Sequence, residues 1–351
     1  MIKGASLFSS AGIAETYFKE AGIDIVVANE LLPKRAQLYS YFYPSADMVC
    51  GDITQASVFT KVKNKIKQND CKFLLATPPC QGMSSLGKKE YSTDKRNYLI
   101  FYVFDIIDDN DFDYVLIENV PKFLKLYFPY EGKLMLLKDI IIDKYSDKYN
   151  VETLELNAQY YDVPQSRPRG FIKMWKKELA WENPKPSKVI TLKDAIGDLP
   201  SLESGESSSL KWHYAKVHND REILAMKHTP EGKSAMKNEV YYPKKPDGTA
   251  IKGFHNTYKR MKWNEPCPAR AMNNGNMGGH NNVHPGRKMP DGTYSDARVL
   301  TLRELFIVSS LPAELDLPDW CSDNLIRTAI GEAIPPKLSL NVVKGIGGHN
   351  E

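Results

Sequence analysis

The 351-residue sequence has little cysteine, and its five cysteines are dispersed without a C-x-x-C pair. This scarcity excludes a disulfide framework and a zinc ribbon, and it is typical of a reducing cytoplasm. The longest apolar run, near residues 99–107, is interrupted by Asp105 and is too short to span a membrane. Met1 leads directly into a strand-like segment without a basic, apolar leader. We therefore expect a soluble cytoplasmic protein.

The sequence also lacks a large excess of one charge. It has 47 Lys and Arg and 43 Asp and Glu, which give a formal net charge of +4. Such a total does not by itself indicate a nucleic-acid-binding protein. The sequence does contain 42% apolar and 11% aromatic residues. This content can bury a sizeable core, which excludes a disordered or fibrous chain.

The first half of the chain alternates short apolar runs with helical patterns. Strands are predicted at 3–8, 23–28, 73–76 and 114–117, with a further edge at Val49 and helices at 13–21, 34–41 and 97–107. This alternation predicts an α/β fold with a Rossmann-like parallel sheet and helices on both faces. Ligands of such sheets bind beyond the carboxyl ends of the strands, where we searched for site residues.

The pattern changes near residue 180, where regular periodicity gives way to Gly, Asn, His, Pro and Lys. We predict a first domain at 1–180, a small irregular domain at 181–290, and a segment at 291–351 that returns to the first domain. Helices are expected at 298–310 and 336–345.

A turn rich in small residues, Ser6–Gly12, ends the first predicted strand, and acids follow the next two strands at Glu30 and Asp52. Small side chains let backbone amides approach a ligand, and an acid about 20 residues further on binds ribose hydroxyls in Rossmann-type sites. Each acid alone is equally typical of a helix cap or a solvated turn. Because the turn and the two acids all lie at the carboxyl ends of successive strands, they favour a cofactor that contains adenosine.

Polar residues also follow the later strands. In Thr77–Gly82, two prolines precede Cys80 at a strand end, the position of an exposed nucleophile, although a lone cysteine is more often structural. Glu118 ends the next strand and can act as an acid toward a ring nitrogen. Arg167 and Arg169 can hold a phosphate or a carbonyl oxygen, or can form a solvated surface pair.

In this order, the motifs resemble those of cytosine-C5 DNA methyltransferases, which use S-adenosylmethionine. The resemblance covers about 175 residues at the start and about 55 at the end. It implies a methyltransferase sheet with a target-recognition domain at 181–290. The cofactor-binding residues that it implies are Phe8, Ser9, Ser10, Ala11, Gly12, Glu30, Leu31, Asp52, Ile53, Pro79, Leu99, Glu332 and Ala333.

The resemblance also implies the catalytic residues. A Cys80 thiolate would add to C6 of a flipped-out cytosine while Glu118 protonates N3. Arg169 would hold O2, Arg167 would bind O2 or a phosphate, and Asn119 would support the loop. The chain departs from the family at Ser10 and Ile13, which replace glycines, at Leu31, which replaces an aromatic residue, and at Glu332, which replaces asparagine.

Charge is concentrated in the predicted recognition domain, where residues 207–290 hold fifteen Lys and Arg against six Asp and Glu, a local net charge of +9. A solvated basic surface would look the same, but the position favours double-stranded DNA as partner. The candidate DNA contacts are Gln81, Ser84, Arg96, Lys259, Arg260, Lys262 and Arg270. No Cys/His spacing indicates a metal, and we expect a monomer.

Two alternatives remain from different classes. The first is an RNA (tRNA) cytosine-C5 methyltransferase, and the second is a catalytically inactive homologue that binds DNA, suggested by the altered cofactor loop. A nicotinamide dehydrogenase has no role for the Pro-Pro-Cys-Gln motif. A methyltransferase acting on amino groups would need an Asp/Asn-Pro-Pro-aromatic motif, which this site lacks. A type II modification enzyme and a solitary enzyme are both consistent with the sequence.

Overall fold

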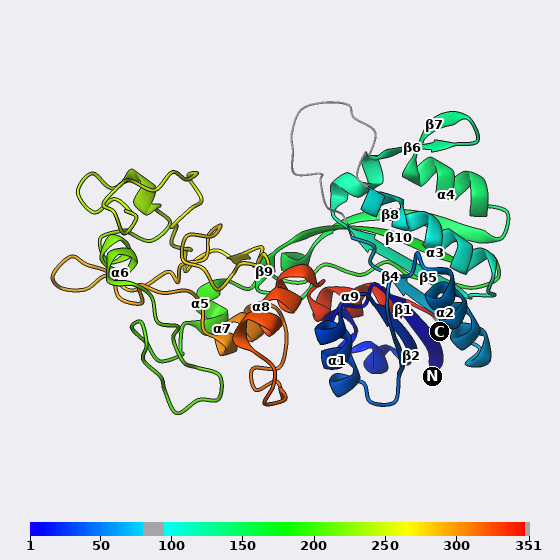
Figure 1. Ribbon diagram of the computed structural model, residues 1–351, viewed down its shortest axis with the longest axis horizontal. Helices are drawn as coiled ribbons and strands as arrows, with labels where there is room; N and C mark the ends of the chain where they lie inside the picture. The colour runs from blue at the N-terminus through cyan, green and yellow to red at the C-terminus, as the bar shows by residue number, and fades with distance from the viewer. Residues whose placement is uncertain (80–94, 348–351) are drawn as a thin grey trace. The chain divides into compact units, whose positions relative to one another are not determined.

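The computed structural model describes residues 1–79 and 95–347, which form two compact units (Figure 1). Unit 1 comprises residues 1–157, 168–185 and 338–351, and unit 2 comprises 158–167 and 186–337. This division differs from the predicted domains, because residues 291–337 pack with unit 2 and only the segment from 338 onward packs with unit 1.

Unit 1 is built on a seven-stranded sheet in the order β3-β2-β1-β4-β5-β10-β8. The five strands from β3 to β5 are parallel, whereas β10 runs antiparallel to both of its neighbours. The predicted parallel sheet is thus confirmed for five strands, and the reversed strand β10 and its neighbour β8 were missed. The strands are β1 (Ile2–Leu7), β2 (Ile23–Glu30), β3 (Asp47–Cys50), β4 (Phe73–Ala76), β5 (Tyr114–Asn119), β8 (Tyr149–Asn157) and β10 (Pro168–Lys176).

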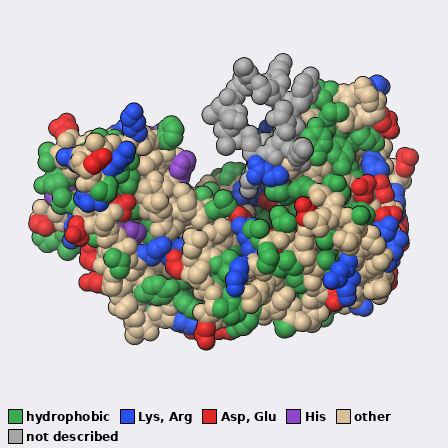
Figure 2. Space-filling view, viewed as in Figure 1, with side chains coloured by type: hydrophobic (Ala, Val, Ile, Leu, Met, Phe, Trp, Pro, Cys, Tyr) green, Lys and Arg blue, Asp and Glu red, His purple; other side chains and the backbone are tan. Residues whose placement is uncertain are grey.

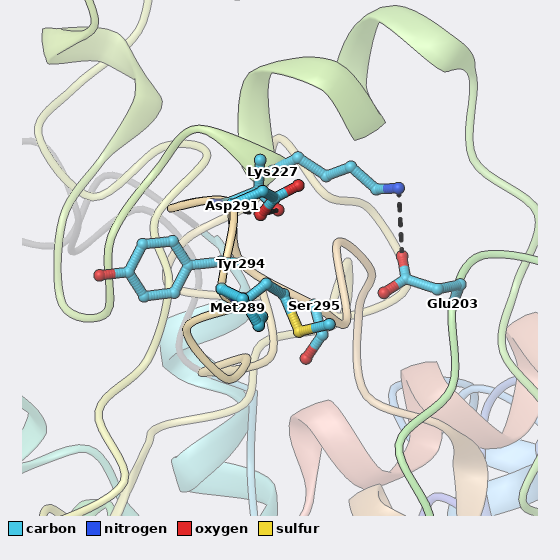
Figure 3. Close-up of a pocket in the computed structure, with 8 residues that line it drawn as sticks. Glu203, Lys227, Met289, Asp291, Tyr294 and Ser295 are labelled. Carbon is cyan, nitrogen blue, oxygen red and sulfur yellow. Dashed lines mark hydrogen bonds and ion pairs between the residues drawn. The ribbon is translucent and has the colours of Figure 1, made fainter.

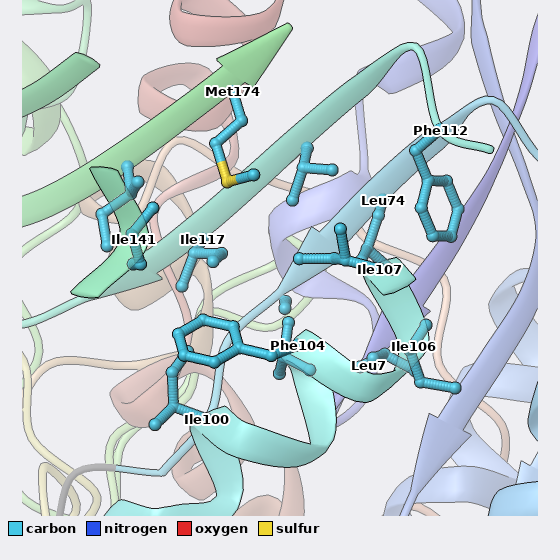
Figure 4. Close-up of a cluster of buried hydrophobic side chains, with 14 of the residues drawn as sticks. Leu7, Leu74, Ile100, Phe104, Ile106, Ile107, Phe112, Ile117, Ile141 and Met174 are labelled. Carbon is cyan, nitrogen blue, oxygen red and sulfur yellow. The ribbon is translucent and has the colours of Figure 1, made fainter. Parts of the chain in front are cut away.

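Helices cover the sheet, and one face carries the main core (Figure 4). Leu74 of β4 lies beside Val115 of β5, which lies beside Met174 of β10, so these side chains share one face. Apolar residues of α2, α3 and α4 pack onto that face in one buried cluster. The helices of unit 1 are α1 (Pro33–Phe42), α2 (Ala56–Gln68), α3 (Leu99–Asp108), α4 (Leu137–Tyr145) and most of α9 (Pro336–Val343).

Aromatic residues pack on the opposite face. The Phe73 ring contacts those of Phe18 and Trp181, with ring centroids 5.8 and 6.5 Å apart. The Trp181 indole N–H donates to the carbonyl of Val342 in α9 at 2.8 Å. This bond ties the C-terminal segment from residue 338 onward to the elements that cover the sheet of unit 1.

The predicted helix at 13–21 is wrong, because the segment forms two 3-10 turns, η1 (Ile13–Glu15) and η2 (Phe18–Ala21). The Thr16 hydroxyl donates to the Ile13 carbonyl at 2.8 Å. Local side-chain bonds of this kind compete with the continuous helical ladder. Gly22, in the left-handed conformation, then ends the segment.

Unit 2 has little regular structure, as predicted. Its helices are α5 (Leu192–Ile196), α6 (Asp220–Lys227), α7 (Leu302–Val308) and α8 (Asp323–Glu332), and its strands are β9 (Gln165–Ser166) and β11 (Cys267–Pro268). Helix α7 begins later than the predicted 298, because Thr301 and Glu304 form a capping box at its start. A separate hairpin in unit 1 joins β6 (Tyr127–Tyr130) to β7 (Lys133–Leu136).

Buried arginines replace regular backbone pairing in unit 2. The Arg260 guanidinium, fully buried, donates to the carbonyls of Met226, Tyr294, His284 and Asp296. A guanidinium has five N–H donors, so one side chain can satisfy several loop carbonyls that no helix or strand would satisfy. Within residues 1–79 and 95–347, no helix is both long and apolar enough to cross a bilayer.

Candidate active site

The loop after β1, residues 8–12, has an unusual backbone. Phe8, Ser10 and Gly12 have φ angles of 60°, 48° and 72°, all in the left-handed region. Hydrogen bonds hold this shape: the Ser9 N–H donates to the Asn29 carbonyl at 3.0 Å, and the Gly12 N–H donates to the Ser9 carbonyl at 2.9 Å. The loop is therefore ordered by its contacts with the end of β2.

Glu30 is the main support of this loop from β2. Its carboxylate accepts the Ser10 N–H at 2.9 Å and the Leu32 N–H at 2.8 Å. The sequence predicted Ser10 and Glu30 as parts of one site, and the structure brings them into direct contact.

Two tyrosines that the sequence reasoning missed, Tyr39 of α1 and Tyr43 directly after it, contact the loop and the turn that follows it. The Tyr43 hydroxyl donates to the Gly12 carbonyl at 2.7 Å, and the Tyr39 hydroxyl donates to the Glu15 carboxylate at 2.6 Å. A Cβ on Gly12 would lie 2.3 Å from the Tyr43 ring, so only glycine fits. Burial raises the pKa of Glu15 to about 7, and the hydrogen bond from Tyr39 opposes that rise.

The residues around this loop fit an adenosine-containing cofactor. The Ser10 Oγ is buried and has no hydrogen-bond partner among the described residues, so it can bind a polar group of a ligand. Leu31 is 56% exposed beside Glu30, where an apolar side chain can cover a flat base. Asp52 lies between β3 and α2, and its carboxylate accepts the Thr54 N–H at 2.9 Å. Ile53 is buried in the core, so a ligand would meet its backbone.

A second group of predicted residues meets beyond β5. The Glu118 carboxylate pairs with the Arg169 Nε of the neighbouring β10 at 2.8 Å, and both side chains are mostly buried. The Asn119 side chain donates to the Pro78 carbonyl at 2.8 Å. Cys80, Gln81 and Ser84 lie outside the described residues, and Pro79 is the last residue before them. The structure thus joins the predicted acid and arginine, and it links Asn119 to the segment that leads to Cys80.

Arg167 differs from Arg169, because it belongs to unit 2 and is buried there. Its guanidinium donates to the carbonyls of Arg270 at 2.5 Å and Gly331 at 2.8 Å. These contacts indicate a structural role and argue against the prediction that Arg167 binds O2 or a phosphate.

Two of the predicted DNA contacts are buried as well. Arg260 and Arg270 are 0% and 1% exposed, and their guanidiniums donate to backbone carbonyls within unit 2. Such side chains cannot reach a phosphate without rearrangement, so we no longer propose them as DNA contacts. Lys259 is half-buried, and Lys262 is exposed and pairs with Glu265 at 2.5 Å.

The remaining predicted residues occupy element ends. Arg96 is exposed in the 3-10 turn η3 (Lys95–Tyr98), and Leu99 begins α3 and packs against the core. Glu332 ends α8 in unit 2, and Ala333 is its C-terminal cap. Among the described residues, no group of His, Cys, Asp and Glu is placed to hold a metal ion.

Comparison with known proteins identifies the family. The family model described as C-5 cytosine-specific DNA methylase matches residues 2–348. The chain belongs to this methylase family. It is 46% identical to the Type II methyltransferase M1.HgaI of Avibacterium volantium over 99% of each chain. It is 26% identical to the Type II methyltransferase M1.HphI of Haemophilus parahaemolyticus, over 97% of this chain and 85% of that protein.

A solved structure resembles the methylase along its length. It is that of a proposed DNA modification methyltransferase encoded within an E. coli prophage, with a TM-score of 0.69, 18% identity and 98% coverage of both chains. This likeness confirms the fold. Membership of the C-5 cytosine methylase family makes the chain a DNA methyltransferase that uses S-adenosylmethionine, as the motifs predicted.

Unit 2 of the methylase also has a cavity of about 410 Å³ that contains none of the predicted site residues (Figure 3). Lys227 and Glu203 face each other across part of it, with Nζ and Oε2 3.9 Å apart. Its lining residues are Glu203, Lys227, Met289, Pro290, Asp291, Thr293, Tyr294 and Ser295.

Proposed function

We propose that the enzyme methylates C5 of a cytosine flipped out of double-stranded DNA through a covalent adduct with Cys80. The observation that carries this proposal is the cluster at the carboxyl end of β5, where Glu118 pairs with Arg169 and the adjacent Asn119 binds Pro78 of the segment that leads to Cys80. An acid, an amide and a guanidinium match the ring nitrogen and carbonyl oxygen of cytosine.

The chemistry follows from the weakness of C5 as a nucleophile. The Cys80 thiolate adds to C6, and the electron pair of the C5–C6 bond becomes available at C5 as Glu118 delivers a proton to N3. S-adenosylmethionine, when bound, supplies the methyl group. Loss of the C5 proton then allows the Sγ–C6 bond to break, and the N3 proton returns to Glu118.

The neighbours of Glu118 position the base. Arg169 pairs with Glu118 through its Nε and donates from Nη1 to the Pro168 carbonyl at 2.7 Å, contacts that orient the guanidinium to hold O2 of the cytosine. Asn119 holds the Pro78 carbonyl and thereby orients the segment before Cys80. Because the Arg167 guanidinium binds the carbonyls of Arg270 and Gly331, we assign the contact with O2 to Arg169.

The partner and biological setting are proposed from the relatives. Both relatives named above are Type II methyltransferases, and M1.HgaI matches nearly the whole chain. We propose a site-specific modification enzyme that works beside a restriction enzyme, in the cytoplasm and as a monomer. Duplex DNA is preferred over RNA as substrate on the same ground.

The test uses tritiated S-adenosylmethionine with duplex DNA and, separately, with tRNA. We expect incorporation into DNA alone, and we expect Cys80→Ser to lose at least about a thousandfold in rate, since the nucleophile is removed. DNA with 5-fluorocytosine at the target should trap a covalent complex, because fluorine cannot leave C5 as a proton does.

The matched control is Cys321→Ser, which changes a half-buried cysteine of unit 2 and should keep full activity and trapping. Full activity of Cys80→Ser would overturn the covalent mechanism. Methyl transfer to tRNA but not to duplex DNA would overturn the choice of substrate.

A further inference from the structure

Four residues of unit 1 form a closed circuit of hydrogen bonds between the loop at 8–12 and the end of α1. The Tyr43 hydroxyl and the Glu15 N–H both donate to the Gly12 carbonyl, at 2.7 and 3.1 Å. The Tyr39 hydroxyl donates to the Glu15 carboxyl at 2.6 Å, and the Tyr43 N–H donates to the Tyr39 carbonyl at 2.8 Å. We call Gly12, Glu15, Tyr39 and Tyr43 the Tyr43 circuit. Each member is bonded to two others, so the loop and the turn η1 after it are both tied to the end of α1.

Most of the Tyr43 circuit is buried. Figure 2 shows charged side chains of both signs on the surface of unit 1, whereas Glu15 is 3% exposed and Tyr39 is fully buried. A buried polar group that loses its partner is costly, so the bond from Tyr39 holds Glu15 in place. The Ser339 hydroxyl of α9 also donates to the Ala14 carbonyl, which ties the turn η1 to a second helix.

The loop needs such supports because its backbone is strained. Phe8, Ser10 and Gly12 all have left-handed φ angles, which residues with a side chain adopt only when their surroundings hold them there. The Glu30 carboxylate holds the middle of the loop through the Ser10 N–H, at 2.9 Å. The Tyr43 hydroxyl holds the end of the loop through the Gly12 carbonyl. The end needs this bond because glycine has the least restricted backbone of all residues.

The peptide that follows Gly12 controls several contacts at once. Its rotation would turn the Gly12 carbonyl away from the Tyr43 hydroxyl and from the Glu15 N–H. Ser10, whose buried hydroxyl has no partner among the described residues, lies only two residues before Gly12. A change in the Gly12 conformation therefore changes the backbone that carries the predicted cofactor contacts.

We propose that Tyr43 is a positioning residue for S-adenosylmethionine, whose hydroxyl fixes the Gly12 carbonyl and thereby keeps the loop at 8–12 in the shape that receives the cofactor. This inference rests on the proposed function and on the prediction that residues 8–12 bind the cofactor. A site that is ordered in advance binds more tightly, because less freedom is lost on binding. The apparent affinity falls in proportion to the fraction of the protein that has the competent shape.

The experiment compares Tyr43→Phe with Tyr149→Phe in the full chain. The Tyr149 hydroxyl donates to the Phe112 carbonyl at 2.8 Å and is buried elsewhere in unit 1, so each substitution deletes a hydroxyl that binds a backbone carbonyl. In calorimetry we expect Tyr43→Phe to bind S-adenosylmethionine about fivefold more weakly, the worth of one net hydrogen bond. Tyr149→Phe should keep the wild-type affinity.

Two further readouts separate positioning from a general loss of stability. Without cofactor, the backbone amides of residues 9–16 should exchange with deuterium faster in Tyr43→Phe than in Tyr149→Phe, although both variants melt below the wild type. With duplex DNA that carries the site mapped by bisulfite sequencing of an expressing host, Tyr43→Phe should raise KM for S-adenosylmethionine about fivefold. Its kcat and its KM for DNA should stay at the wild-type values, because saturating cofactor restores the shape of the loop.

Equal affinities of Tyr43→Phe and Tyr149→Phe for S-adenosylmethionine, whether both unchanged or both lowered, would overturn the proposal. A lower kcat of Tyr43→Phe at saturating cofactor with unchanged affinity would also overturn it, because the hydroxyl would then act in a later step. Absence of methyl transfer by the wild-type chain would instead overturn the proposed function, and the calorimetric comparison does not depend on that activity.

Discussion

At the scale of single residues, Ser10 combines a left-handed backbone with a buried hydroxyl that has no partner among the described residues. A non-glycine residue in that region costs about 1–2 kcal/mol. The Glu30 carboxylate holds the Ser10 N–H and thereby stabilises the conformation. Because the family usually has glycine here, the strain is retained together with a hydroxyl that glycine lacks. This pairing points to a contact between the hydroxyl and the bound cofactor.

Two substitutions at Ser10 distinguish the effect of its strained backbone from the effect of its hydroxyl. Ser10→Ala removes the hydroxyl and keeps the strain, whereas Ser10→Gly removes both. We expect each variant to bind S-adenosylmethionine about fivefold more weakly in calorimetry, because a net hydrogen bond of about 1 kcal/mol is lost. Ser10→Gly should also melt at a higher temperature than Ser10→Ala. Wild-type affinity in Ser10→Ala would show that the hydroxyl does not contact the cofactor.

At the scale of elements, helix α7 depends on one carboxylate for two tasks. Glu304 accepts the Thr301 N–H at 2.7 Å in the capping box and pairs with Arg298 at 2.8 Å. All three side chains are buried. The start of α7 is thus joined to the arginine that also binds Asp296 and the Leu202 carbonyl.

The prediction for this element compares two substitutions. Thr301→Ala removes the hydroxyl that caps the Glu304 N–H and contacts the His213 ring at 3.1 Å, and it should lower the free energy of unfolding by about 1–2 kcal/mol. Glu304→Gln keeps an acceptor for the Thr301 N–H but removes one charge partner of the buried Arg298, and it should cost about 3 kcal/mol or more. Urea denaturation of both variants measures the difference. Equal losses would mean that the Arg298 pair contributes nothing beyond the cap.

The elements that the sequence predicts correctly are those with a strong apolar pattern. Period-2 and period-3.6 patterns predicted β1, β2, β4 and β5, and with them the strand-end positions of Glu30 and Glu118. Strand β8 was missed because a half-exposed strand shows a weaker apolar pattern, and β10 was missed because Lys173 interrupts its buried apolar run. The wrong helix at 13–21 followed from reading apolar spacing without the competing Thr16 bond.

Which side chains are buried in the loop-rich unit 2 is the property that is hardest to predict from the sequence. Arg260 lies next to Lys259 in the sequence, yet it is fully buried while its neighbour is half-buried. No periodicity marks which basic residue turns inward when the backbone is irregular. The contacts of Arg260 with loop carbonyls become visible only when the loops are assembled.

At the scale of the whole molecule, the two units carry buried titratable groups of opposite behaviour. In unit 2, burial lowers the pKa of His284 to about 4, and the nearby Arg298 adds to this effect. Burial also lowers the pKa of His218 to about 4, with Lys216 contributing. In unit 1, burial raises the pKa of Glu15 from its ordinary value of 4.5 to about 7. The stability of each unit should therefore depend on pH with a different sign.

For the histidines, the unfolded chain binds protons that the folded chain excludes between the ordinary pKa of 6.5 and about 4. Their stabilising contribution is complete above pH 6.5 and is lost as the pH falls through 4. Glu15 behaves oppositely, because its folded form holds a proton that the unfolded chain releases above pH 4.5. Its contribution is complete below pH 4.5 and is lost as the pH rises through 7.

Calorimetric melting between pH 7 and pH 4.5 tests this prediction, which follows from the pKa directions of these groups. We expect the transition of unit 2 to move to lower temperature relative to that of unit 1 as the pH falls. His284→Gln, which keeps an acceptor for the Gly286 N–H, should reduce this separation, and Glu15→Gln should reduce it from the other side. If the melting temperatures of the two units changed equally between pH 7 and pH 4.5, the predicted opposite pH dependence of their stabilities would be contradicted.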